Sequence, residues 1–231
     1  MIESIFEVEI NIINNIINIS FCFIIKKVFQ LKTEGKSKEK LLEELKKLSY
    51  SLLNLQSQYI KDKEALSIFK ESQSRARSMA IIHQRLYQST DLKRIDFGDY
   101  IQTLTMELFR TYQSDPDHIK MNIDVENLEI DINTTVPLGL IVNELVSNCL
   151  KHAFPDGKKG ELNIDFHKID DEYVLKVCDT GVGFPEDLDF KKTESLGLQL
   201  VTNLTCQIDG EIELDRSHGT EFTIKFKEAT L

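Results

Sequence analysis

Residues 133–155 read NTTVPLGLIVNELVSNCLKHAFP, and this long apolar stretch with sparse polar residues decides the fold. Thr134 or Thr135 is expected to cap a helix here, and Pro137 suits a first helical turn because its missing N–H costs nothing there. Apolar side chains occupy most of the circumference, which predicts a largely buried helix. These side chains are Leu138, Leu140, Ile141, Val142, Leu145, Val146 and Leu150.

Four polar residues interrupt this apolar helix: Glu144, Asn148, Lys151 and His152. Their spacing of i, i+4, i+7 and i+8 places them on one face of an α-helix. A buried helix carries such a group only where a ligand or a polar cavity satisfies it. A partly exposed helix face is the alternative, and this helix alone does not decide between the two.

Two later stretches favour a ligand. Residues 179–185 read DTGVGFP and follow an apolar, strand-like run. Asp179 at the end of a strand, followed by Gly181 and Gly183, gives a carboxylate next to backbone that can approach a ligand closely. Further on, Ser195 and Gly197 open the apolar helix SLGLQLV, where free backbone N–H groups can receive phosphate.

Together with Gly219-Thr220-x-Phe222, these stretches resemble the four nucleotide-binding boxes of the Bergerat ATP-binding fold, and they occur in the same order. Sensor histidine kinases, gyrase-like enzymes and Hsp90-like chaperones share that fold. One such box would be weak evidence, whereas four in order are strong. The resemblance implies that the chain binds ATP together with Mg²⁺.

The resemblance also implies a role for each residue around the base. Asp179 would accept a hydrogen bond from the adenine amino group, which a carboxylate at a strand end suits. Gly181 and Gly183 would let the backbone pass close to the base, and Thr220 would support adenine through water. The alternative for Asp179 is an ordinary turn-capping residue before glycine, which the other boxes disfavour, and Thr220 taken alone could equally be a strand hydroxyl.

At the phosphate end, the resemblance makes Asn148 the ligand of Mg²⁺, which prefers oxygen donors and keeps several waters. Lys151 would neutralise phosphate charge, and His152 would add a donor nearby. The helix opened by Ser195 would offer the N–H groups of Gly197 and Leu198 to the β- and γ-phosphates. Glu144 would act as a weak base that orients the attacking group.

The sequence predicts a pair of helices over residues 36–59 and 63–88. Each has a seam of mostly apolar side chains at alternating steps of three and four, and the second seam also contains Gln73 and His83. Two such seams joined by a short turn cannot both be buried within one chain, so a dimeric four-helix bundle is expected. Residues 52–56 (LLNLQ), 71–80 (ESQSRARSMA) and 82–88 (IHQRLYQ) resemble the dimerisation helices of the histidine-kinase subfamily related to the HWE kinases. The W-x-E element of the HWE group is absent because the chain has no Trp.

The pattern departs from this subfamily at the phosphoacceptor. Residues 39–51 read EKLLEELKKLSYS and contain no histidine where the subfamily carries one. His83 falls on the seam of the second helix, and the others lie in turns, strands or the nucleotide box. Three hypotheses stay open: phosphoryl transfer in trans or to another residue, a non-enzymatic ATP-binding dimer that regulates an intact kinase, and a decayed gene product. The paired bundle helices argue against an anti-sigma-type serine kinase and a chaperone-like ATPase.

The expected fold class is α+β, with a dimerisation helical hairpin over 37–92 followed by a Bergerat α/β sandwich over 95–231. A connecting helix is expected over 95–112, and two strands over 119–132 are separated by a turn near Asn127. Four more strands are expected at 161–167, 172–178, 211–215 and 221–226. They complete a mixed sheet with helices on one face, and the polar segment 186–194 would form a short lid.

Residues 1–36 are an apolar, Asn-rich segment that suits a packing or coiled-coil helix, with membrane contact through residues 10–27 as the alternative. A net charge of −10 argues against nucleic acid as the main partner. The four cysteines lack metal-ligand spacing, which suggests reduced thiols in a cytoplasmic protein. The expected partners are a second copy or a related kinase, bound through residues 37–90, and a response regulator.

Overall fold

The computed structural model describes residues 62–88, 94–112, 117–193 and 195–228, together with Ser57 and Ile60. The chain divides into two compact units, Met1–Gln73 and Ser74–Leu231. Most of the predicted first bundle helix and all of residues 1–36 lie outside the described residues. None of the described helices is long and apolar enough to cross a membrane.

The second predicted bundle helix is confirmed as α3, Lys63–Gln88. In the first unit it begins directly after Asp62, whose carboxylate accepts a hydrogen bond from the N–H of Ala65 at 2.7 Å, as an N-cap residue does. In the second unit, Ile81 and Ile82 of α3 are buried in the main core. His83 belongs to this helix, but its side chain lies outside the description.

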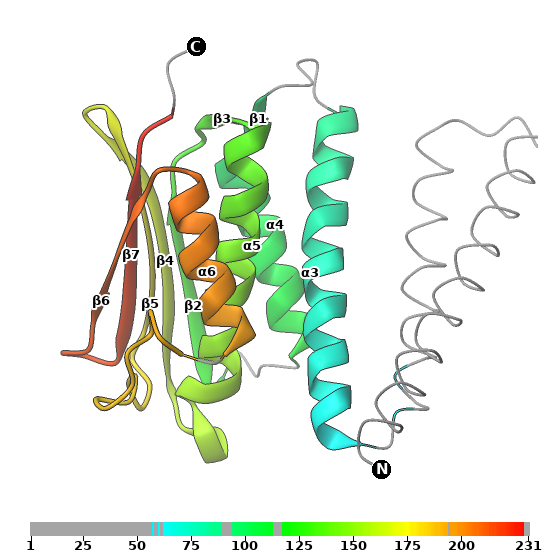
Figure 1. Ribbon diagram of the computed structural model, residues 1–231, viewed down its shortest axis with the longest axis vertical. Coiled ribbons are helices and arrows are strands. Elements are labelled where there is room, and N and C mark those ends of the chain that lie inside the picture. The colour runs from blue at the N-terminus through cyan, green and yellow to red at the C-terminus, as the bar shows by residue number, and fades with distance from the viewer. Residues whose placement is uncertain are drawn as a thin grey trace, which may run out of the picture. The chain divides into compact units, whose positions relative to one another are not determined.

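The second unit contains a five-stranded mixed sheet in the order β2-β4-β5-β7-β6 (Figure 1). Its strands are β2 (Ile119–Val125), β4 (Gly160–Ile169), β5 (Glu172–Asp179), β6 (Glu211–Asp215) and β7 (Thr220–Phe226). β2 and β4 are parallel and the other neighbours are antiparallel. The predicted mixed sheet is therefore confirmed, with each of these strands within two residues of its expected ends.

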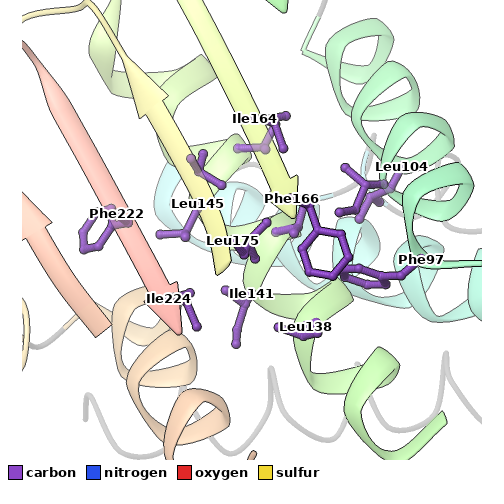
Figure 2. Close-up of a cluster of buried hydrophobic side chains, with 14 of the residues drawn as sticks. Phe97, Leu104, Leu138, Ile141, Leu145, Ile164, Phe166, Leu175, Phe222 and Ile224 are labelled. Atoms are coloured by element: carbon purple, nitrogen blue, oxygen red, sulfur yellow. The ribbon is translucent and has the colours of Figure 1, made fainter. Parts of the chain in front are cut away.

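Three helices cover one face of this sheet, as predicted: α4 (Phe97–Thr111), α5 (Ile132–Asn148) and α6 (Leu196–Gln207) (Figure 1). Side chains from the sheet and from α4 and α5 meet in the layer between them (Figure 2). Phe166 is fully buried there and lies edge-on to Phe97, with ring centroids 5.0 Å apart. Alternating burial along β4 and β5 follows from the two-residue period of a strand with one face on the core.

A second, two-stranded sheet was not predicted. β1 (Arg94–Asp96) pairs antiparallel with β3 (Glu129–Asp131). The expectation of a helix from residue 95 was therefore wrong, because Ile95 pairs with Ile130 and Asp96 instead caps α4. The turn near Asn127 does not join a hairpin, since β2 pairs with β4 rather than with β3.

The cap of the central helix was also predicted wrongly. Asp131, not Thr134 or Thr135, is the N-cap of α5, and its carboxylate accepts from the N–H of Asn133 at 2.8 Å. The hydroxyl of Thr135 instead bonds back to the Asp131 carbonyl at 3.0 Å inside the helix. Pro137 therefore lies within α5 rather than in its first turn.

The aromatic layer generates a stability prediction. Replacing Phe166 with Ala should lower the free energy of unfolding by about 3–5 kcal/mol, because a fully buried ring leaves a cavity between sheet and helices. Ile169→Ala on the same strand is the matched control: Ile169 is 60% exposed, so a change within about 0.5 kcal/mol is expected. Urea unfolding followed by circular dichroism measures both, and equal losses would contradict the assigned core.

Candidate nucleotide-binding site

The end of α5 departs from the expected helix. The α-helix stops at Asn148 and continues as one π-helical turn, Cys149–Ala153. A π turn is wider than an α turn and is frequent at functional sites. The expectation of one regular helix to residue 155 was wrong, so the simple i, i+7 and i+8 geometry does not apply to Lys151 and His152.

The π turn binds the loop that follows β5. The carbonyl of Ala153 accepts a hydrogen bond from the N–H of Val182 at 2.9 Å. A Cβ at Gly181 would lie only 2.2 Å from that carbonyl oxygen, so glycine is required for this close contact. The sequence identified Gly181 as a close-approach glycine, and the structure shows that the segment it approaches is the end of α5.

Asp179 lies at the end of β5 and is 2% exposed. One carboxylate oxygen accepts from the N–H of Gly181 at 2.9 Å. The buried thiol of Cys149 is close enough for the negative charge of Asp179 to raise its pKa. Within the part of the chain that the structure describes, no lysine or arginine forms an ion pair with it. Burying a carboxylate that accepts hydrogen bonds only from neutral groups costs free energy, unless further donors reach it.

Thr220 comes next to Asp179 across the sheet, because the two residues are register partners in β5 and β7. The preceding Gly219 has a φ of +109°, and a Cβ there would lie 2.0 Å from the Asp179 carbonyl oxygen. Gly183, with a φ of +83°, also approaches Gly219. The structure thus brings together Asp179, Gly181, Gly183 and Thr220, which come from two separate stretches of the sequence.

A second group surrounds Glu144, which is 4% exposed. Its carboxylate accepts two hydrogen bonds from the guanidinium of Arg75 in α3, both at 2.8 Å. Gly197 at the start of α6 lies against it, since a Cβ at Gly197 would be 2.7 Å from Oε2 of Glu144. The structure therefore brings Glu144 and the Ser195–Leu198 turn together. Arg75 lies in the stretch ESQSRARSMA (71–80), which resembles the dimerisation helices of the subfamily. The sequence alone indicated no role for it.

The other residues predicted for the phosphate side are less enclosed. Asn148 is half-buried at the last turn of α5, one helical turn beyond Glu144. Lys151 is half-buried, and its ammonium lies 5.7 Å from the ring centre of Tyr112, a cation–π contact. His152 and Ser195 are exposed, whereas Gly197 and Leu198 are buried. Ser195 precedes α6 without a side-chain cap, so the first N–H groups of α6 are not capped by it.

The loop between β5 and α6 is anchored by aromatic residues. Phe184 and Phe190 both lie edge-on to Phe222 of β7, with ring centroids 6.0 and 5.4 Å away. Arg216 lies over Phe184 and donates to the carbonyl of Leu188 at 2.9 Å. The prediction of a polar lid over 186–194 did not include these aromatic contacts. Phe190, an isolated aromatic residue in a charged stretch, was the signal in the sequence that could have indicated them.

Comparison with known proteins identifies the family and agrees with the fold. Residues 44–112 match the family model HisKA_2, described as histidine kinase. Residues 133–230 match HATPase_c, described as the histidine kinase-, DNA gyrase B- and HSP90-like ATPase. The second match contains every predicted site residue from Glu144 to Thr220. The chain therefore belongs to the histidine kinase family, with a HisKA_2-type helical region followed by an ATPase-type domain.

Individual proteins that resemble this chain are also named histidine kinases. The chain is 27% identical over 179 residues to the sensor histidine kinase PdtaS of Mycobacterium tuberculosis, covering 76% of this chain and 35% of the relative. It is 28% identical over 142 residues to blue-light-activated histidine kinase 2 of Erythrobacter litoralis, covering 58% and 40%. The chain thus spans between a third and two fifths of the length of these relatives.

Solved structures show the same fold. The histidine kinase domain of the Erythrobacter litoralis EL346 blue-light activated kinase superimposes with a TM-score of 0.65 at 20% identity, covering 89% of this chain and 93% of that one. The Acinetobacter baumannii histidine kinase AdeS gives a TM-score of 0.52 at 17% identity, covering 93% and 98%. At these identities the likeness establishes the α+β Bergerat fold.

The site generates a prediction about thiol reactivity. Cys149 is buried, and burial together with the negative charge of Asp179 raises the pKa of its thiol well above the usual value. Because the thiolate is the reactive form, Cys149 should react about tenfold or more slowly than the exposed Cys206 with a water-soluble disulfide reagent at pH 8. Peptide mapping by mass spectrometry separates the sites. Equal rates in the native chain would contradict the assigned surroundings of Asp179, and the denatured chain is the control.

Proposed function

We propose that this chain binds Mg-ATP and works as a histidine-kinase-like protein of two-component signalling. The observation that carries the proposal is the buried Asp179 carboxylate, which accepts from the N–H of Gly181 and lies opposite Thr220. An adenine amino group supplies the donor that such a carboxylate accepts. Gly181 and Gly219 let the neighbouring backbone pack closely around Asp179, which fixes the carboxylate at the proposed adenine position.

The phosphates would extend from this adenine position toward α6. The N–H groups of Gly197 and Leu198 open α6 and would bind phosphate oxygens, with the exposed Ser195 beside them. Lys151 and His152, on the π turn, would add a positive charge and a donor. Phosphoryl transfer depends mainly on such positioning and charge neutralisation.

The residues present fit a magnesium ion. Asn148 offers a neutral side-chain oxygen on a half-buried turn, and Mg²⁺ needs only one or two protein oxygens because it keeps several waters. When bound with ATP, the ion would neutralise phosphate charge. Glu144 lies one helical turn before Asn148 and would act as the weak base that orients the attacking group.

Two functions are compatible with the missing phosphoacceptor histidine. The first is phosphoryl transfer to a partner chain. The second is a non-enzymatic, ATP-binding dimer that regulates an intact kinase. Residues 39–51 contain no histidine, which favours both over self-phosphorylation at the usual position. The histidines whose side chains are described lie outside the bundle helices: His118 and His218 are in turns, and His152 is on the π turn. His167 is on β4 between the carboxylates of Asp124 and Glu126. His83 is on α3, where the sequence predicts a place on the helix seam.

The proposed partners follow from the same assignment. A second copy or a related kinase would pair through residues 37–90, where the seamed helices need apolar partners. A response regulator would receive the signal or the phosphoryl group. The assignment of 37–92 to the dimerisation hairpin and of 95–231 to the ATP-binding domain forms part of this proposal.

Replacing Asp179 with Asn tests the nucleotide site. The Asn amide has a single acceptor oxygen, no negative charge and an NH₂ group that only donates, so ATP affinity should fall about 10- to 100-fold, the loss expected for one hydrogen bond to a charged group. The preference for ATP over GTP should also shrink, because the Asn amide donates to the guanine carbonyl. Titration calorimetry with Mg-ATP and Mg-GTP measures both affinities.

Asp165→Asn is the matched control for this test. Asp165 lies half-buried on β4 and faces Asp124 across the β2–β4 pairing, away from the adenine position. ATP affinity should therefore stay unchanged in Asp165→Asn. Undiminished ATP binding by Asp179→Asn would refute the assignment of the adenine site.

A further inference from the structure

The ion pair between Arg75 and Glu144 is the most enclosed charge pair among the described residues. The side chains of Arg75 and Glu144 are 14% and 6% exposed. Nε of Arg75 donates to Oε1 and Nη2 donates to Oε2, which is the two-pronged geometry that arginine forms best with a carboxylate. Arg75 belongs to α3, whereas the other proposed nucleotide-site residues lie between Glu144 and Thr220.

Neighbouring side chains fix this geometry. The hydroxyl of Ser74 donates to the Asn143 side-chain oxygen at 2.8 Å, and the Asn143 amide donates to Oε1 of Glu144 at 3.0 Å. Further along α3, the hydroxyls of Ser78 and Tyr100 share a hydrogen bond at 2.8 Å. Glu144 is therefore held in one orientation from two sides, and Oε2 remains the oxygen that faces α6.

The position of Oε2 makes its charge important for a nucleotide. A Cβ on Gly197 would lie 2.7 Å from Oε2, so the carboxylate is adjacent to the turn proposed to bind the terminal phosphates. An unpaired carboxylate there would repel a triphosphate strongly, because like charges interact with little screening in a buried site. The guanidinium of Arg75 cancels that charge where the phosphates would arrive.

We propose that Arg75 is a positioning residue of the nucleotide site, which neutralises and orients Glu144 so that the start of α6 accepts the terminal phosphates of ATP. This inference rests on the proposed function, since it names the residue that makes the proposed phosphate site usable. It also assigns to α3 a role in nucleotide selectivity: Arg75 favours longer phosphate chains over AMP.

Arg75→Met tests this role through relative affinities for Mg-ATP, Mg-ADP and AMP, measured by titration calorimetry. Removing the guanidinium should weaken Mg-ATP about tenfold or more, Mg-ADP less, and AMP by less than about twofold, since AMP has no phosphate near α6. Arg77→Met is the matched control. Arg77 lies on the same helix, and its guanidinium donates to the hydroxyl of Thr111 at 2.7 Å rather than to Glu144, so all three affinities should stay unchanged.

A double variant separates charge from folding. Arg75→Met combined with Glu144→Gln removes both charges, so it should bind Mg-ATP more tightly than Arg75→Met alone. If Arg75→Met does not fold, Glu144→Gln alone is compared with the wild type. Retaining the guanidinium without its carboxylate should raise the ATP-to-AMP affinity ratio, and an unchanged or lower ratio would overturn the proposal.

The failures of the two proposals are distinguishable. A wild-type chain that binds no nucleotide would overturn the proposed function and this inference with it. A wild-type chain that binds ATP, while Arg75→Met weakens ATP and AMP equally or not at all, would overturn only the role of Arg75. A loss confined to the longer phosphate chains supports the role, because a purely structural effect would not distinguish between nucleotides.

Discussion

Burial of α5 is the constraint on which the rest of the structure depends. The helix lies against the sheet on one side and against other helices on the other, and twelve of its residues are buried, including Asn143 and Glu144. Burying polar groups is costly unless each finds a partner. Arg75 and Asn143 bind Glu144, and Ser74 binds Asn143, so the neighbours of α5 are determined by its polar groups as well as by its apolar ones.

The end of the same helix lies beside the proposed adenine position. The π turn at Cys149–Ala153 places Cys149 near Asp179 and binds the loop after β5 through the Ala153 carbonyl. Glu144 in the same helix lies against Gly197, the proposed phosphate position. In the proposed site, α5 therefore contacts both the adenine position and the phosphate position.

Much of this arrangement could be predicted from the sequence, because its signals are local. Alternation of apolar residues identified β2 and β4 to β7, and the three-and-four spacing identified α3 with its observed ends. The glycines at 181 and 183 were predicted to let the backbone approach a ligand, and the structure shows that they approach Ala153 and Gly219 in the protein itself. The order of the motifs also indicated the family.

Other features depend on tertiary contacts and left no local signal. Ile95 joins a strand because Ile130 lies opposite it, although its own segment is helical in pattern. Asp131 caps α5, although Thr134 and Thr135 also have side chains suited to a cap and lie nearer the apolar run. Arg75 is 69 residues from Glu144, and nothing in the spacing of either residue indicates that they form a pair. The π turn could not be inferred because helical periodicity assumes a regular helix.

The main proposal is a usable ATP site in a chain without the usual phosphoacceptor histidine. The decisive measurement is incubation with Mg²⁺ and γ-labelled ATP, alone and mixed with an intact histidine kinase of the same family. We expect ATP to bind and no acid-labile label to appear on this chain alone. Acid-labile label on the isolated chain would refute the proposal, because phosphohistidine is lost in acid and residues 39–51 contain no histidine, so a residue such as His83 on α3 would have to be the acceptor.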